Sequence, residues 1–121
     1  MSQTVAGILV DTLEKIGVRH IFGLIADSLN PIADAVRHSK IEWIGVRHEE
    51  GAALAAAGQA KLTGRLGVCC GSTGPGSNHL VAGLYEASRG PRAGSRALRG
   101  HAAQDAGHRL FSSDRSQHAF P

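Results

Sequence analysis

The fold of this chain is decided by residues 46–76, VRHEEGAALAAAGQAKLTGRLGVCCGSTGPG. Within this stretch an acidic pair, Glu49 and Glu50, follows an apolar segment that ends at Val46, and a glycine-rich turn at residues 71–76 follows a second apolar segment. In an open parallel sheet both features would lie at the carboxyl ends of neighbouring strands, which is where such sheets bind ligands. We therefore expect the chemistry of the protein at this edge.

Apolar residues on either side of this stretch alternate between helical and strand spacing. Strands are predicted at residues 20–24, 41–46 and 66–70. Helices are predicted at residues 5–16, after a cap at Asp27 or Ser28, from Glu49 to Gly64, and at about residues 77–88. This alternation predicts an α/β fold, a partial doubly wound parallel sheet covered by helices.

The composition is that of one globular domain or part of one. The chain has 121 residues, of which 42% are hydrophobic and 19% are charged, and this length is too short for two ordinary domains. No apolar run approaches the roughly 18 residues of a membrane span, and Asp11 follows the N-terminal apolar residues too early for a secretory signal. We therefore expect no transmembrane segment and a cytoplasmic location.

The sequence changes character after Ser88. Residues 1–88 contain 14 Val or Ile, 7 basic and 8 acidic residues, whereas residues 89–121 contain no Val or Ile, 6 arginines and 2 acidic residues. No apolar periodicity remains to build the next strand, so we expect a disordered or irregular basic tail. A nucleic-acid-binding arm is the alternative, but arginines without interleaved aromatic residues support it weakly. We expect no nucleic-acid partner.

Three short motifs could indicate a disulfide, metal or nucleotide site, but their residue types and spacing argue against each one. Cys69 and Cys70 are adjacent in a predicted strand, so their side chains point to opposite faces, and we expect buried thiols rather than a disulfide or a metal site. The zinc pattern HExxH would need a histidine where the chain has Ala52. The turn at residues 71–76 could hold an anion at a helix start, but it lacks GxGxxG spacing and Pro75 removes a donor, so a dinucleotide site is not favoured.

Glu49, considered alone, is an ordinary helix-start residue, stabilised by about 0.3–1 kcal/mol through the helix dipole. The order of the surrounding motifs gives it a different meaning. They are GVxxIxG at 17–23, DSLN at 27–30, RHEE at 47–50, GVCxGSxGPG at 67–76, His-Leu at 79–80 and Gly-Leu-Tyr at 83–85. Together they resemble the N-terminal pyrimidine-binding domain of thiamine-diphosphate enzymes, and are most similar to the pyruvate oxidase and pyruvate:quinone dehydrogenase branch. The resemblance runs from about residue 3 to residue 88 and covers about half of that domain.

The resemblance implies a catalytic role for Glu49. In the family this carboxylate hydrogen-bonds N1′ of the aminopyrimidine and favours the imino tautomer that takes the proton from thiazolium C2. Such a carboxyl should be largely dry at a subunit interface, and so inclined to hold or share a proton. Glu50 is left as a surface or capping residue. The residues implied to lie around or near the pyrimidine are Ile25, Ala26, Thr73, Gly74, Pro75, Gly76 and His79; no metal ligand is implied in this chain.

Two departures from the family pattern stand out. Ala26 takes a position where the family often has glycine, so a strained positive φ is a possible cost there. From Arg89 onward the chain replaces the family's apolar strand with an Arg/Ala/Gly-rich segment. We put forward the hypothesis that residues from about 89 are translated out of frame, because G- and C-rich codons for residues 91–102 can encode that strand in a shifted frame.

The resemblance implies a fragment of a homo-oligomeric enzyme that decarboxylates a small 2-oxo acid, with thiamine diphosphate shared between subunits. Mg²⁺ and possibly FAD belong to the complete enzyme, and the diphosphate and Mg²⁺ ligands to a domain outside this chain. We expect the chain to be inactive and marginally stable alone. An acetolactate-synthase-like fragment is one alternative, and a non-catalytic small protein acting through its basic tail is another.

Overall fold

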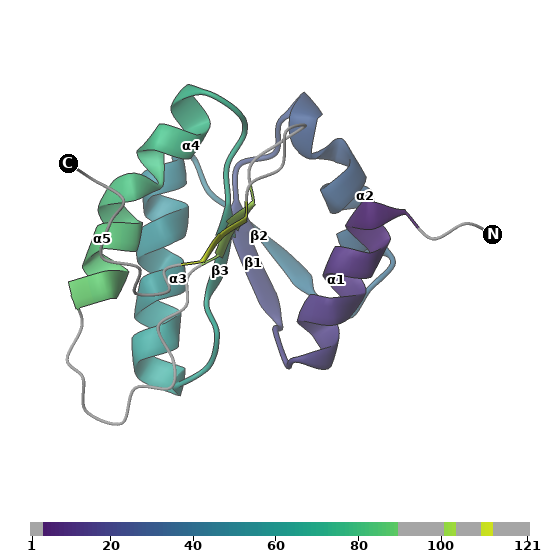
Figure 1. Cartoon of the computed structure of the whole chain (residues 1–121), viewed down its shortest axis with the longest axis horizontal. Coiled ribbons are helices and arrows are strands. Elements are labelled where there is room, and N and C mark those ends of the chain that lie inside the picture. Colours follow the sequence, from purple (N-terminus) through teal and green to yellow (C-terminus); the bar gives the residue numbers. More distant parts are fainter. Residues whose placement is uncertain (1–3, 90–100, 104–109, 113–121) are drawn as a thin grey trace.

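A computed structural model describes residues 4–89, 101–103 and 110–112 of the chain. Helices cover both faces of a central sheet, with α1 and α2 on one face and α3, α4 and α5 on the other (Figure 1). The α/β fold and the parallel sheet predicted from the sequence are confirmed. The elements are α1 (Val5–Lys15), β1 (His20–Gly23), the 3₁₀ helix η1 (Asp27–Leu29), α2 (Asn30–Arg37), β2 (Glu42–Gly45), α3 (Glu49–Thr63), β3 (Val68–Cys70), α4 (Pro75–His79), α5 (Val81–Arg89), β4 (His101–Ala103) and β5 (Leu110–Ser112).

The sheet has the strand order β2-β1-β3-β4-β5. β1 pairs in parallel with both β2 and β3, with Phe22 opposite Ile44 on one side and Cys69 on the other. Consequently β1, β2 and β3 all end at the same edge, and the loops that follow them are brought together. The first residues of α3 and the glycine-rich turn lie at this edge.

Each face of the sheet has its own small core. Val10, Ile21, Val36, Val68 and Cys70 belong to the cluster beneath α1 and α2. The opposite cluster is built from the alanines of α3 with Cys69 and Leu80. The two cysteines form no disulfide and are buried on opposite faces, as predicted from their adjacency, and burial raises the pKa of each thiol to about 12.

Threonine begins one helix, and glycine ends another as the sequence predicts. Thr4 Oγ1 accepts a hydrogen bond from the N–H of Gly7 at the start of α1. α3 ends at Gly64, whose φ of 67° lies in the left-handed region that glycine adopts most easily.

The predicted cap of the second helix is wrong. Neither Asp27 nor Ser28 caps it, because both lie inside η1, and the residue before α2 is Leu29, which makes no side-chain cap. The short 3₁₀ turn positions the buried Leu29 side chain before the α-helix begins, so packing takes precedence over capping here. Ile32 and Val36 are buried on the inward side of α2.

The predicted fourth helix is two helices. α4 ends at His79 and α5 begins at Val81, with the fully buried Leu80 between them. Leu80 and Leu84 contribute to the core, whereas Val81 and Tyr85 are exposed. Gly83 and Ala87 take inward positions instead, because α5 lies too close to α3 for larger side chains.

Two three-residue strands occur in the tail, where the sequence predicts none. β4 pairs with β3 in parallel and β5 pairs with β4 antiparallel. Strand pairing uses backbone groups, so it does not require the apolar pattern whose absence guided the prediction. The rest of the tail, and with it most of the segment that the out-of-frame hypothesis concerns, lies outside the described residues.

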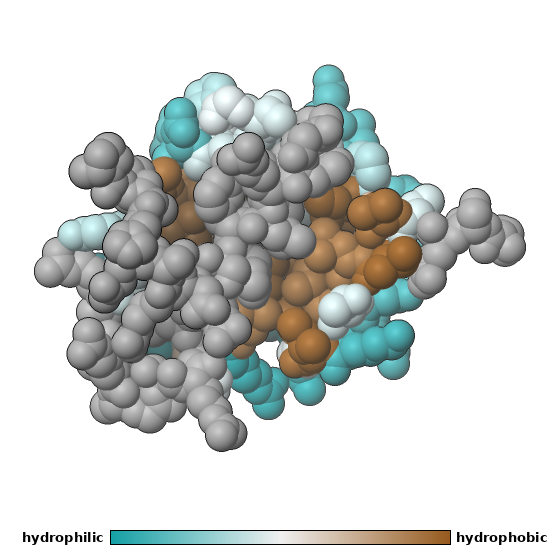
Figure 2. Space-filling view, viewed as in Figure 1, coloured by the Kyte–Doolittle hydropathy of each residue, from teal (hydrophilic) through white to brown (hydrophobic). Residues whose placement is uncertain are grey.

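Apolar side chains also lie on the surface. Figure 2 shows a broad apolar area over the α1 side of the face in view. Val5, Ile8 and Ile16, on or next to α1, are among the exposed large hydrophobic residues. Within the described part of the chain, no helix is both long and apolar enough to span a membrane.

Candidate functional site

The candidate site lies at the sheet edge where β2 and β3 end. His48 is the N-cap of α3 and its Nδ1 accepts a hydrogen bond from the N–H of Glu50 at 3.3 Å. Glu49 is therefore the first residue of the helix, at its positive end. Its side chain is only 9% exposed, whereas the side chain of Glu50 is half exposed, as expected for a surface residue.

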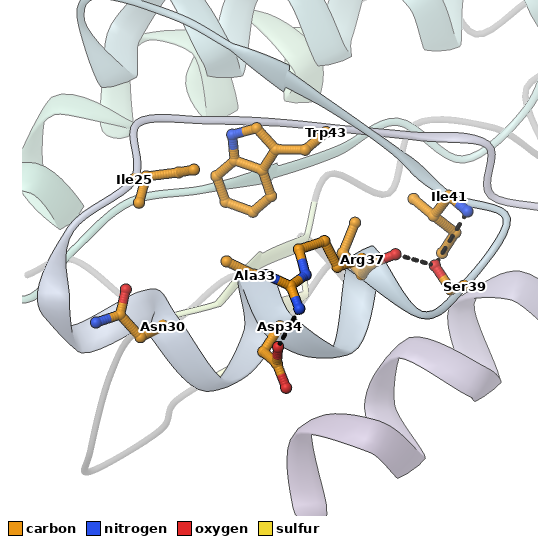
Figure 3. Close-up of a pocket in the computed structure, with 9 residues that line it drawn as sticks. Ile25, Asn30, Ala33, Asp34, Arg37, Ser39, Ile41 and Trp43 are labelled. Carbon is orange, nitrogen blue, oxygen red and sulfur yellow. Dashed lines mark hydrogen bonds and ion pairs between the residues drawn. The ribbon is translucent and has the colours of Figure 1, made fainter.

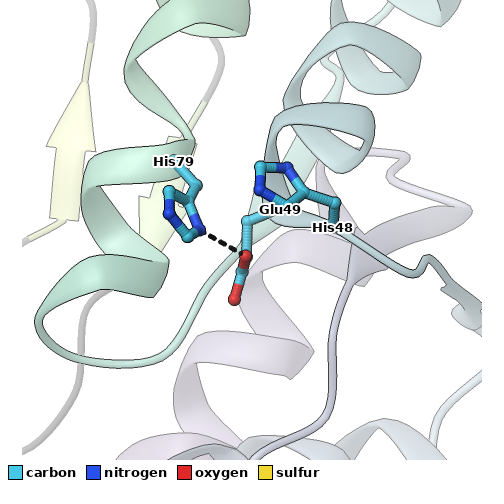
Figure 4. Close-up of side chains that lie close together, drawn as sticks. All are labelled: His48, Glu49 and His79. Atoms are coloured by element: carbon cyan, nitrogen blue, oxygen red, sulfur yellow. Dashed lines mark hydrogen bonds and ion pairs between the residues drawn. The ribbon is translucent and has the colours of Figure 1, made fainter.

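His79, at the end of α4, faces Glu49 across the edge (Figure 4). Its Nδ1 lies 2.9 Å from Oε2 of Glu49, a hydrogen-bond distance at which the ring N–H donates to the carboxylate. The ring of His79 also stacks on the ring of His48, with 4.4 Å between centroids and 26° between planes. The two histidines thus border a carboxylate that is almost covered.

Two glycines of the turn make room for this carboxylate. A Cβ atom added to Gly76 would lie 2.9 Å from Oε1 of Glu49 and 2.5 Å from Oγ of Ser72. One added to Gly71 would lie 3.2 Å from Cγ of Glu49 and 2.8 Å from the backbone oxygen of Gly76. Any larger residue at these two positions would therefore have to displace its neighbours.

The carboxyl of Glu49 has a pKa below its ordinary value of 4.5, chiefly because His79 donates a hydrogen bond to it. Burial acts in the opposite direction, while a bond from the backbone N–H of Glu49 and positive charge on the two histidines lower the pKa further. The expectation that a carboxyl dry at a subunit interface holds a proton stays a prediction, because the structure contains a single chain. In this chain the hydrogen bond from His79 outweighs the desolvation by burial.

The other predicted turn residues shape the site rather than border the carboxylate. Gly74 has a φ of 70° and precedes α4, and Pro75 takes the first position of that helix, where a missing N–H costs nothing. Thr73 lies in the turn itself. Ser77 Oγ, in α4, donates to the backbone oxygen of Ser72 at 2.7 Å and ties the helix to the turn.

Ile25 and Ala26 follow β1 at the same edge of the sheet. Ala26 has a φ of −143°, so the predicted strain from a positive φ is absent and the residue is simply extended. Ile25 lines a groove of about 580 Å³ between α2 and β2, together with Trp43 and Ile41 (Figure 3). Glu49 is not among the residues that line this groove. The structure therefore brings Glu49, Gly76 and His79 together and places Ile25 in a separate hollow.

The sequence prediction missed His48 and Gly71 as members of the site. The capping role of His48 had no clear signal in the sequence, because the residues preferred before a helix are Ser, Thr, Asp, Asn and Gly. The stacking of His48 on His79 had no signal in the sequence, since the two are far apart along the chain.

The chain is similar to known proteins over most of its length. A family model described as "Thiamine pyrophosphate enzyme, N-terminal TPP binding domain" matches residues 3–92. An uncharacterized 42.6 kDa protein in the isoamylase 3′ region of Pseudomonas amyloderamosa is 51% identical over 86 residues, or 70% of this chain and 22% of that protein.

Two named enzymes are similar to about two thirds of the chain. Pyruvate oxidase of Lactiplantibacillus plantarum is 51% identical over 81 residues, which is 65% of this chain and 13% of that enzyme. Acetolactate synthase of Arthrospira platensis is 46% identical over 83 residues, 65% of this chain and 14% of that enzyme. The chain thus spans less than a quarter of the length of these relatives. Since the family model matches well over half of the chain, the chain belongs to the family of N-terminal thiamine pyrophosphate-binding domains of thiamine pyrophosphate enzymes.

Proposed function

We propose that Glu49 binds the aminopyrimidine of thiamine diphosphate and that the chain is part of a thiamine-diphosphate-dependent enzyme that decarboxylates a 2-oxo acid. The observation that carries the proposal is a nearly covered carboxylate at a helix start, with glycines on either side. A flat ring that presents a protonated nitrogen needs such an acceptor and little side-chain bulk around it.

Each residue of the site has its own role in this proposal. His79 bonds Oε2 of Glu49, so we assign Oε1 to the ring nitrogen of the pyrimidine. The lowered pKa keeps Glu49 charged at neutral pH, so that its oxygen can accept a hydrogen bond from the ring nitrogen when that nitrogen carries a proton. Gly71 and Gly76 keep the edge open, and the Thr73-Gly74-Pro75 turn positions them. When bound, thiamine diphosphate supplies the nucleophilic carbon that attacks the 2-oxo acid.

Among 2-oxo-acid enzymes we assign the chain to the pyruvate oxidase type, with pyruvate as substrate and FAD as a further cofactor. The similarity to a pyruvate oxidase and the His79-Leu80 pair support this assignment. The acetolactate synthase type is the second candidate, supported by the relatives of that name. In either case we assign the diphosphate and Mg²⁺ ligands to another part of the complete enzyme, and propose a homo-oligomer in which subunits share the cofactor.

The experiment is a calorimetric titration of the full chain with thiamine diphosphate, comparing Glu49→Gln with Glu50→Gln. A hydrogen bond to a charged group contributes about 1.5–3 kcal/mol, so Glu49→Gln should weaken binding roughly 10- to 150-fold. Glu50→Gln also removes one negative charge, but from the exposed neighbouring residue, and should leave the affinity for thiamine diphosphate unchanged. Equal affinities for the two variants would refute the role of Glu49.

We also propose that the residues after about 88 are read out of frame. The end of the family match at residue 92 supports this, because the change of composition begins at Arg89. Sequencing the gene tests the hypothesis: a shifted frame should encode an apolar strand directly after Ser88. If neither shifted frame encodes such a strand, the hypothesis is rejected.

A further inference from the structure

Three side chains of the site have the composition of a transition-metal centre. Ligand atoms of His48, Glu49 and His79 lie within 4.8 Å of one another. Two imidazoles and one carboxylate are a ligand set that Zn²⁺, Co²⁺ and related divalent ions accept, with remaining positions open to water. The HExxH pattern missed this combination, because His79 reaches Glu49 from α4 rather than from the next turn of α3.

The spacing of two of these ligands already suits a shared ion. Donors about 2.0–2.2 Å from one tetrahedral ion lie roughly 3.3–3.6 Å from each other, and His79 Nδ1 is 2.9 Å from Glu49 Oε2. An ion inserted between them would need only a small separation of the two groups. It would take the place of the proton that the pair now shares, as metal binding to histidine generally does.

The third ligand has to turn toward the ion. The ring of His48 is stacked on that of His79, so the two rings must splay for their nitrogens to converge. The side chain of His48 is 55% exposed, and so nothing buried has to be moved. Its Nδ1 accepts the N–H of Glu50, which leaves Nε2 as the nitrogen that binds the metal.

We propose that the cofactor-free chain binds one divalent transition-metal ion, such as Zn²⁺ or Co²⁺, through His48, Glu49 and His79. The metal site stands on its own geometry, and only one consequence rests on the proposed function. If Glu49 holds the pyrimidine, a bound metal ion occupies the carboxylate that the cofactor needs. The ion would then block cofactor loading reversibly.

The test uses the untagged full chain, titrated with Co²⁺ and followed by the visible absorption of the bound ion, with no thiamine compound present. One ion per chain is expected. His79→Asn and His48→Asn should each weaken Co²⁺ binding at least about tenfold, because each removes a ligand. Even the loss of a group that only hydrogen-bonds a ligand lowers metal affinity by about 10- to 100-fold. His38→Asn is the control, because His38 also lies near a carboxylate, 4.0 Å from Asp34, but directly after α2 and not at this site.

Equal Co²⁺ affinity of the wild-type chain and His48→Asn would overturn the proposal, as would an equal loss in His38→Asn. His48 is exposed, so its replacement keeps the test valid even where His79→Asn fails to fold. Because thiamine is absent, a negative metal result leaves the pyrimidine titration with Glu49→Gln as a separate measurement.

Discussion

The bond between Glu49 and His79 links stability to pH. The folded state lowers the pKa of Glu49 below 4.5, so folding favours the charged carboxylate. The resulting stabilisation is fully present above the ordinary pKa and is lost as pH falls through the lowered folded value. We expect the free energy of unfolding of wild type, relative to Glu49→Gln, to shrink steadily below pH 4.5. Urea unfolding of both proteins from neutral to acid pH measures this difference in the free energy of unfolding. A difference that grows toward acid pH would contradict the prediction.

Gly76 should matter more for binding than for stability. In Gly76→Ala the new methyl group would meet the ends of two side chains, Ser72 Oγ and Glu49 Oε1, which can move aside. We therefore expect a loss at the low end of the usual overpacking range, about 1–3 kcal/mol, but a loss of thiamine diphosphate affinity comparable to that of Glu49→Gln. Gly45→Ala, with nothing within 4 Å of its added Cβ, is the control and should change neither.

The sequence predicted the placement of Glu49 and of the glycine-rich turn better than it predicted the electrostatics of Glu49. The position of Glu49 after a strand, and of Gly76 after the next strand, followed from the alternation of elements, since parallel strands end at one edge. The direction of its pKa shift did not follow. That direction depends on whether His79 reaches Oε2, and this requires α4 to stop at His79 before the chain turns at Leu80.

At the scale of elements, the contact between α3 and α5 depends on small residues. A Cβ added to Gly83 would meet Ala53 Cβ and lie 2.6 Å from the backbone carbon of Ala53, which cannot move without the helix. We expect Gly83→Ala to destabilise the chain by about 1–3 kcal/mol or more. Gly58→Ala, in α3 with open space around it, should instead stabilise by up to about 1 kcal/mol through helix propensity. Thermal and urea unfolding measure the stability of the two variants. Equal changes in stability would show that the contact between α3 and α5 is not tight.

Helix boundaries set by local residues could be predicted, whereas those set by packing could not. α1 and α3 end where the periodic residues meet a glycine, so local chemistry alone decides them. The start of α2 and the break at Leu80 are decided by the burial of Leu29 and Leu80 in tertiary cores, which no local signal reports. Propensity and capping patterns give way when a large apolar side chain has a buried position to fill.

For the molecule as a whole, two thin cores share one narrow sheet. One face depends on aliphatic residues of α1 and α2, and the other on alanines that let α3 and α5 approach closely. Several large apolar side chains remain at the surface while alanines occupy the interior. This distribution is typical of a unit that buries further surface against a partner.

The outer side of α1 should therefore drive self-association. Val5, Ile8 and Ile16 follow helical spacing along its exposed side, where Figure 2 shows apolar surface. We expect the Val5→Gln/Ile8→Gln double variant to sediment as a smaller species than the wild type at the same concentration, with unchanged helix content because glutamine is a good helix former. Leu62→Gln is the control: Leu62 is 89% exposed but belongs to α3, on the other face of the sheet. Sedimentation velocity over a range of concentrations decides between them, and a wild type that stays monomeric throughout, or a control that dissociates equally, would show that this side of α1 is not an interface.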